Sequence, residues 1–192
     1  SNHLANIPVH NSSYFKENID SVETLWIKTI KYRGAASFRR ILSWLDFELR
    51  LWLIPIHYLP KPDVIVVSSL SLLSILNGYW FKKKFKCKLI FEIRDIWPLT
   101  IIEEGGFSKW DPFVMCLGWV ERFGYGISDV IIGTMPNLTE HVEEVTGQKK
   151  NCHCIPFGYD PNLYSWHEPL PEGYEANYIP PQKFIVGYAG SV

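Results

Sequence analysis

Two oppositely charged side chains follow an apolar stretch near the middle of the chain and are the first candidates for chemistry. Residues 88–93 are rich in β-prone apolar side chains, so they predict a buried strand. Arg94 and Asp95 come at its carboxyl end, and Pro98 stops it. Ligands of open α/β sheets bind outside the carboxyl ends of strands. The pair therefore predicts part of a binding site; a structural ion pair or a turn cap is the open alternative.

Other candidates lie at strand ends, in a turn and on a helix. Two acidic residues and two glycines form a turn beyond the charged pair, and a Ser and a Thr end two further predicted strands. A Glu lies within the apolar face of a predicted helix, where a carboxylate must be paired or face a cleft. For the Ser, helix capping is the alternative role, and for this Glu it is a buried ion pair. These residues are Glu48, Ser68, Glu103, Glu104, Gly105, Gly106 and Thr134.

The composition of the 192-residue chain is that of a globular protein, with 47% hydrophobic and 20% charged residues. The net charge of −1 gives no field that would favour nucleic acid. Aromatic residues make up 15% of the chain, which fits packing and also fits a protein that handles sugars or lies near lipid. No apolar run is long enough to span a bilayer.

The four cysteines form no CxxC pair. Cys152-His153-Cys154 has no second ligand pair at zinc spacing, so we expect no metal site. Free thiols are the default in a reducing cytoplasm, where we expect the protein to lie.

Strands and helices are predicted to alternate along the chain, which indicates an α/β fold with a doubly wound parallel sheet and helices on both faces. The β-branched run over 62–69 predicts a strand covered on both faces. The expected strands are 62–69, 87–93, 128–134 and 153–160, with one short strand near 25–30 in a loop-rich segment, 14–36. The expected helices are 37–54, 70–85, one from Asp111 to about Gly124, and one capped by Asn137 with Glu140 in a capping box.

A basic run over 82–88 ends the second predicted helix. Cations there complement the helix dipole, and attraction to anionic lipid is the alternative. The apolar segment 52–59 is open to a similar pair of interpretations, because it can be buried against a sheet or lie on a membrane surface.

Five segments in this order resemble bacterial family-4 glycosyltransferases with the GT-B fold, in the branch of O-antigen and capsule assembly. The resemblance covers nearly the whole chain, and the ordered set is more specific than any one segment. The segments are Pro62–Ser69, Glu92–Pro98, Ser128–Thr134, Ile155–Asp160 and Val186–Ser191.

The resemblance implies two Rossmann-like domains facing across a cleft. Residues 1–160 would form the acceptor-side domain, 161–183 the interdomain linker, and 184–192 the first strand of the nucleotide-sugar domain. Such enzymes need no metal or other cofactor and retain anomeric configuration. The donor would be a nucleotide sugar, expected to be UDP-linked, and the acceptor an undecaprenyl-linked or other saccharide. The enzyme would then lie on the inner face of the plasma membrane as a peripheral protein.

Carried over position by position, the resemblance makes Asp95 the candidate catalytic residue, orienting a sugar hydroxyl, and lets Arg94 hold a phosphate. The turn over 103–106 would contact the acceptor, Thr134 would lie at the cleft edge, and Gly190 with Ser191 would approach the donor diphosphate. Relatives often have His where this chain has the Arg-Asp pair.

The chain also lacks the family's first strand, its glycine-rich loop and its Glu-x7-Glu motif, so we expect it to be truncated at both ends and inactive alone. A non-catalytic α/β binding or regulatory module is the alternative function. A nucleotide-sugar epimerase would need a G-x-G-x-x-G fingerprint, and the sequence has none.

Overall fold

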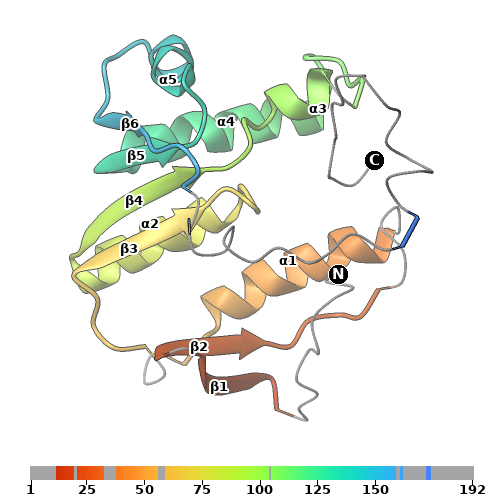
Figure 1. The fold of residues 1–192 in the computed structure, drawn as a ribbon, viewed down its shortest axis with the longest axis vertical. Coiled ribbons are helices and arrows are strands. Elements are labelled where there is room, and N and C mark those ends of the chain that lie inside the picture. The colour runs from red at the N-terminus through yellow and green to blue at the C-terminus, as the bar shows by residue number, and fades with distance from the viewer. Residues whose placement is uncertain are drawn as a thin grey trace. The chain divides into compact units, whose positions relative to one another are not determined.

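A computed structural model describes residues 12–19, 21–32, 38–55, 59–103, 105–158, 161 and 172–173, with the side chains of residues 38, 40 and 41 left aside (Figure 1). The chain divides into two compact units, Ser1–Pro156 and Phe157–Val192. All described helices and strands lie in the first unit. The expected linker over 161–183 and the expected strand over 184–192 lie outside the described residues, apart from 161, 172 and 173.

A four-stranded parallel sheet forms the centre of the first unit, which confirms the α/β class. Its strands lie in the order β3-β4-β5-β6, so each strand pairs with the one before it in the chain. Runs of β-branched and aromatic residues supply the first three strands, as their propensities predict. The strands are β3 (Val64–Ser68), β4 (Lys88–Ile93), β5 (Val130–Gly133) and β6 (Cys152–Cys154).

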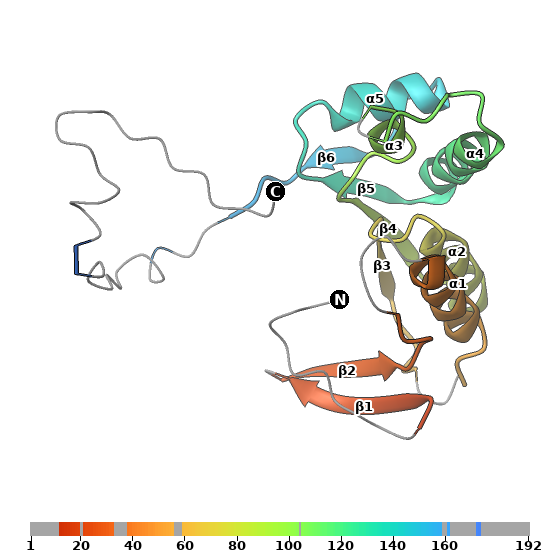
Figure 2. The same cartoon turned by 90° about the vertical axis from the view of Figure 1, so that its right-hand side faces the viewer.

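The helices that connect these strands lie on one side of the sheet (Figure 2). Parallel crossovers are right-handed, so a strand order that follows the chain keeps every connecting helix on the same face. An additional helix, α1 (Phe38–Trp52), packs against the first of them. The connecting helices are α2 (Ser74–Phe85), α3 (Leu99–Glu103), α4 (Pro112–Ile127) and α5 (Leu138–Thr146).

The two faces of the sheet differ in burial. Leu89 and Phe91 of β4 are fully buried beneath the helices and belong to the main apolar core. Val64 and Val66 of β3 point to the other face and are 49% and 57% exposed. Within the described part of the chain the second layer of helices is therefore not present, and β3 is covered on one face instead of the expected two.

The N-terminal segment contains an antiparallel hairpin where one short strand was expected. Strand β1 (Tyr14–Ile19) pairs with β2 (Val22–Ile27) in a register that leaves a two-residue connection. Ser21 in this connection has a positive φ of 67°, as tight hairpin turns require. The Tyr14 hydroxyl donates to the Arg50 carbonyl at 2.8 Å and ties the hairpin to α1.

The predicted helix caps have different outcomes. Asp111 caps α4 as expected, because its side chain accepts from the Phe113 amide at 2.8 Å and Pro112 occupies the first turn. The prediction of a capping box at α5 is wrong: Asn137 is the N-cap residue, but its side chain makes no capping hydrogen bond. Its backbone, at φ −88° and ψ 10°, is outside the extended region that a side-chain cap ordinarily uses.

Asp129 precedes β5 and forms ion pairs with two lysines of the basic run at 82–88. Its carboxylate lies 2.8 Å from Lys82 Nζ and 3.2 Å from Lys88 Nζ, and it accepts from the Leu89 amide at 2.8 Å. The hydrogen bond from Lys82 is the main cause that lowers the pKa of Asp129 from 3.8 to about 2.

We expect the free energy of unfolding to fall by about 1 kcal/mol as the pH drops from about 4 to about 2 through protonation of Asp129. The folded pKa is below the unfolded value, so this stabilisation is present above pH 4 and is lost on acidification. Urea unfolding at pH 7, 4, 3 and 2 should show that Asp129→Asn removes this part of the acid loss. Asp63→Asn, at an exposed position before β3, is the control and should leave the acid loss unchanged.

Candidate site at the carboxyl edge of the sheet

Three of the predicted site residues lie at the carboxyl ends of neighbouring parallel strands. Ser68 ends β3 and is paired in register with Glu92 of β4. Ile93 and Gly133 are register partners at the ends of β4 and β5. Arg94 and Thr134 follow them directly, so the sheet brings these positions to one edge, as predicted.

A buried serine holds the backbone of the charged pair. Ser69 is 1% exposed, and its Oγ accepts from the Arg94 amide at 2.8 Å and from the Asp95 amide at 3.4 Å. The same hydroxyl donates to the Asp95 carbonyl at 3.4 Å. The backbone that carries both charged side chains is therefore fixed to the loop that follows β3.

The side chains of Arg94 and Asp95 are both exposed. Among the described residues, neither takes part in an ion pair or a side-chain hydrogen bond, so the structural ion pair and the turn cap that were the alternatives are not formed there. A guanidinium and a carboxylate that are solvated, adjacent and mounted on a fixed backbone can bind a polyanion and a hydroxyl group.

The turn after the charged pair is built on short backbone contacts. Glu103 is exposed at the end of α3, and Glu104 lies outside the described residues. The Gly105 amide donates to the Ile101 carbonyl at 3.0 Å, and a Cβ on Gly105 would lie 2.6 Å from that oxygen. Gly106 has a φ of +67°, which favours glycine. Both glycines therefore have a backbone reason for their presence, whether or not the turn contacts a ligand.

Glu48 has a different environment from the charged pair. It is 8% exposed, and its Oε1 accepts from the hydroxyls of Ser71 and Ser74, each at 2.6 Å. Its Oε2 accepts from Asn77 Nδ2 at 2.7 Å. No ion pair satisfies this carboxylate within the described chain. Three neutral donors near the N-terminus of α2 do so instead, and they give Glu48 the structural role of joining α1 to α2.

Strand alternation separates Ser68, which ends β3, from Ser69, which follows it. Val67 and Ser69 are on the face beneath the helices, whereas Ser68 shares the other face with the exposed Val66. Sequence reasoning chose Ser68, with helix capping as its alternative role, but counting the period of two from the apolar residues would have selected Ser69. The Oγ of Ser68 is buried and has no hydrogen-bond partner among the described residues.

Ser69→Ala is expected to lower the free energy of unfolding by about 1–3 kcal/mol, because it removes a buried hydroxyl and leaves the part-buried Arg94 amide without this partner. Ser68→Ala is the matched control and should be nearly neutral, since its hydroxyl has no hydrogen-bond partner among the described residues. Chemical unfolding measures both, and hydrogen exchange should show faster exchange at the Arg94 amide in Ser69→Ala alone. Equal effects of the two substitutions would contradict the role given to Ser69.

A second polar cluster, which sequence reasoning missed, joins α4 to α5. Glu121 is 3% exposed; its Oε1 accepts from the Tyr125 hydroxyl at 3.0 Å and lies 2.8 Å from His141 Nε2. Burial, followed by the negative charge of Glu121, raises the pKa of Tyr125 far above its usual value. Burial also raises the pKa of the nearby Cys152 thiol. The sequence pattern that could have revealed this cluster is a Glu and a Tyr four residues apart within an apolar helix. Glu121 and Tyr125 are buried between the packed helices and His141 is 16% exposed, so we give the cluster the structural role of joining α4 to α5.

The remaining predictions concern residues or ligands that the structure does not describe. Gly190 and Ser191 lie outside the described residues. The described part of the chain contains no group of three or more His, Cys, Asp or Glu side chains that could hold a metal ion. None of its described helices combines the length and the apolar character needed to cross a membrane. Comparison with protein-family models and with curated proteins finds no match to this chain.

Proposed function

We propose that this chain supplies the acceptor-binding part of a retaining glycosyltransferase. The enzyme would move a sugar from a nucleotide-sugar donor, expected to be UDP-linked, to a lipid-linked or saccharide acceptor in cell-surface polysaccharide synthesis. We propose further that it is a cytoplasmic protein that works at the inner face of the plasma membrane. The ordered resemblance of five sequence segments to family-4 glycosyltransferases supports this proposal.

The structural observation that carries the proposal is the pair of solvated charges at the carboxyl edge of the parallel sheet. Asp95 would orient the acceptor hydroxyl, and Arg94 would hold a phosphate oxygen through charge-assisted hydrogen bonds. Thr134 begins the segment after the adjacent strand and offers a hydroxyl at the same edge. Ser69 acts on the site indirectly, because it fixes the backbone of the charged pair.

The test is release of nucleoside diphosphate from UDP- and GDP-linked sugars, with bacterial membrane extract as the source of acceptor. The gene product that contains this chain should release one nucleotide, and the release should depend on the extract. The 192-residue chain alone should release none. Absence of release by the gene product with every donor would contradict the proposal and support a non-catalytic α/β binding module.

A further inference from the structure

The outer sides of α1 and α4 carry apolar side chains that the fold leaves exposed. On α1, Leu42, Leu45 and Leu49 recur at intervals of three and four, which places them on one side of the helix. Leu45 and Leu49 are 49% and 59% exposed. On α4, Met115 and Trp119 are four residues apart and are 56% and 62% exposed. Neither helix therefore buries its whole apolar surface in this chain.

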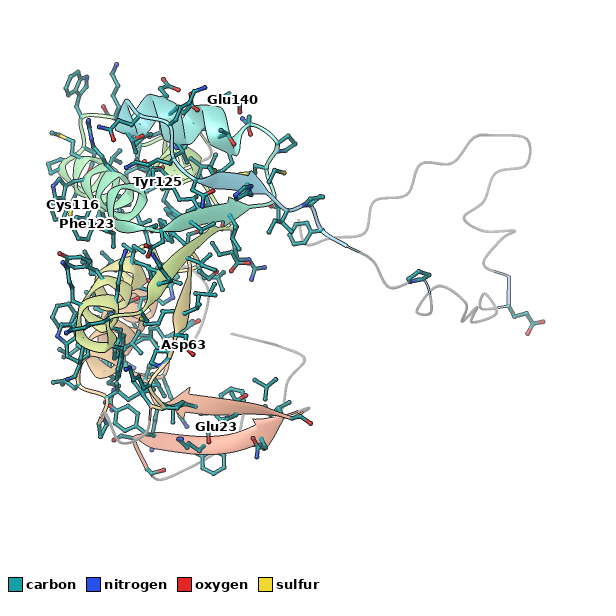
Figure 3. All side chains as sticks on the ribbon, turned by 90° about the vertical axis from the view of Figure 1, so that its left-hand side faces the viewer. Glu23, Asp63, Cys116, Phe123, Tyr125 and Glu140 are labelled. Carbon is teal, nitrogen blue, oxygen red and sulfur yellow. The ribbon has the colours of Figure 1, made fainter. Side chains whose placement is uncertain are left out.

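Aromatic contacts connect the three helices across this surface. Trp52 of α1 stacks on Trp80 of α2, with ring centroids 6.3 Å apart. The neighbouring Tyr79 of α2 meets Phe123 of α4 edge to face at 5.3 Å, and Phe123 stacks on Trp119 at 5.6 Å. Figure 3 shows Phe123 on the side of α4 that faces away from the sheet. We call this surface of α1, α2 and α4 the aromatic face.

The aromatic face carries exposed basic side chains, although the whole chain has a net charge of −1. Its three helices carry seven Lys and Arg residues and three acidic residues. Two of those acidic residues, Glu48 and Glu121, are buried, and Asp46 is paired with Arg50 at 2.9 Å. Lys82 is likewise paired, with Asp129 at 2.8 Å, whereas Lys83 and Lys84 are exposed and form no ion pair with the described residues.

Two exposed lysines lie directly among the aromatic rings. Lys83 Nζ is 5.5 Å from the centre of the Tyr79 ring, and Lys84 Nζ is 4.5 Å from the centre of the Trp80 ring. Trp and Tyr favour the headgroup level of a bilayer, and lysines on a helix surface attract anionic headgroups. Aromatic residues and Met are also enriched at protein–protein interfaces, whereas Lys is depleted there, so the two lysines among the rings are what favours lipid over a protein partner.

We infer that the aromatic face docks on the surface of an anionic lipid bilayer, with α1, α2 and α4 lying against the headgroups. The apolar side chains of α1 and α4 would enter the headgroup boundary, and Lys83 and Lys84 would contact lipid phosphates. The inference deepens the proposed membrane location. It does not depend on sugar transfer, because vesicle binding needs neither donor nor acceptor.

The test is cosedimentation of the 192-residue chain with vesicles of phosphatidylcholine, with and without phosphatidylglycerol. We expect binding only to the vesicles that contain phosphatidylglycerol, and weaker binding at high salt. The double variant Lys83→Gln/Lys84→Gln should lower the partition coefficient about 30-fold. Trp119→Ser and Leu49→Ser should each lower it as well, with an unchanged circular dichroism spectrum because both side chains are exposed.

Two control variants separate the aromatic face from general charge and hydrophobicity. Lys149→Gln/Lys150→Gln removes the same charge after α5, and Val66→Ser removes an exposed apolar side chain on the opposite face of the sheet. Both should keep wild-type vesicle binding. Failure to bind anionic vesicles, or equal losses in the controls, would overturn the inference. Self-association of the chain that Trp119→Ser abolishes would also overturn it and would assign the face to a second copy.

Discussion

Asp95→Asn is expected to lower sugar transfer by the gene product about 100- to 1000-fold, the cost of losing a charged group that acts directly on the reacting sugar. The substitution keeps the size of the side chain but removes the charge and one acceptor. Its effect on folding should be small, because the Asp95 side chain is exposed and makes no hydrogen bond or ion pair among the described residues. Release of nucleoside diphosphate measures the first effect, and chemical unfolding measures the second.

The matched control is Asp63→Asn, an exposed aspartate that precedes β3 and therefore lies at the amino edge of the same sheet. It should keep wild-type activity, because ligands bind at the other edge. If both variants retain full activity, the charged pair is not part of the site. If both lose activity equally, the loss reflects net charge and not position.

Glu48→Ala is expected to lower the free energy of unfolding by about 2–4 kcal/mol, which is more than we expect for Ser69→Ala or Glu48→Gln. It removes the one carboxylate that accepts from Ser71, Ser74 and Asn77, and it opens a cavity between α1 and α2. Equilibrium unfolding in urea measures the loss.

Glu48→Gln separates loss of charge from loss of contact at the same position. The Gln carbonyl can still accept from both serines, and its amide can donate to Asn77 Oδ1, which has no partner among the described residues. That exchange requires the Asn77 amide to turn over, so we expect a smaller loss of about 1 kcal/mol. A loss as large as that of Glu48→Ala would show that the charge itself, near the N-terminus of α2, is the main stabilising factor.

Local signals in the sequence predicted most of the sheet. β-branched runs gave β3, β4 and β5, and the Asp111-Pro112 pair gave the start of α4, because these signals depend on the local backbone. The hairpin was missed, since its apolar and polar residues do not alternate and no glycine marks its turn; Ser21 supplies the positive φ instead. Coverage of the sheet on one face depends on strand order, which no single segment encodes.

The sequence likewise predicted some features of the candidate site and missed others. That Arg94 and Thr134 would meet at one edge followed from predicting two parallel neighbours, β4 and β5. The partners of Glu48 and the role of Ser69 did not follow, because they depend on which loop and helix pack against each residue. A buried carboxylate satisfied by neutral donors and one satisfied by a cation are indistinguishable in the sequence of the helix that carries it.

The order of the strands also has a consequence for how the protein is made. Each described strand from β4 to β6 pairs with the strand that precedes it in the chain, so the partner of each of these three strands has already been synthesised. The chain segments that must close between paired strands are therefore short, compared with those in a sheet whose central strand is synthesised last. The four described strands can therefore join the sheet one at a time, in chain order, as the chain leaves the ribosome.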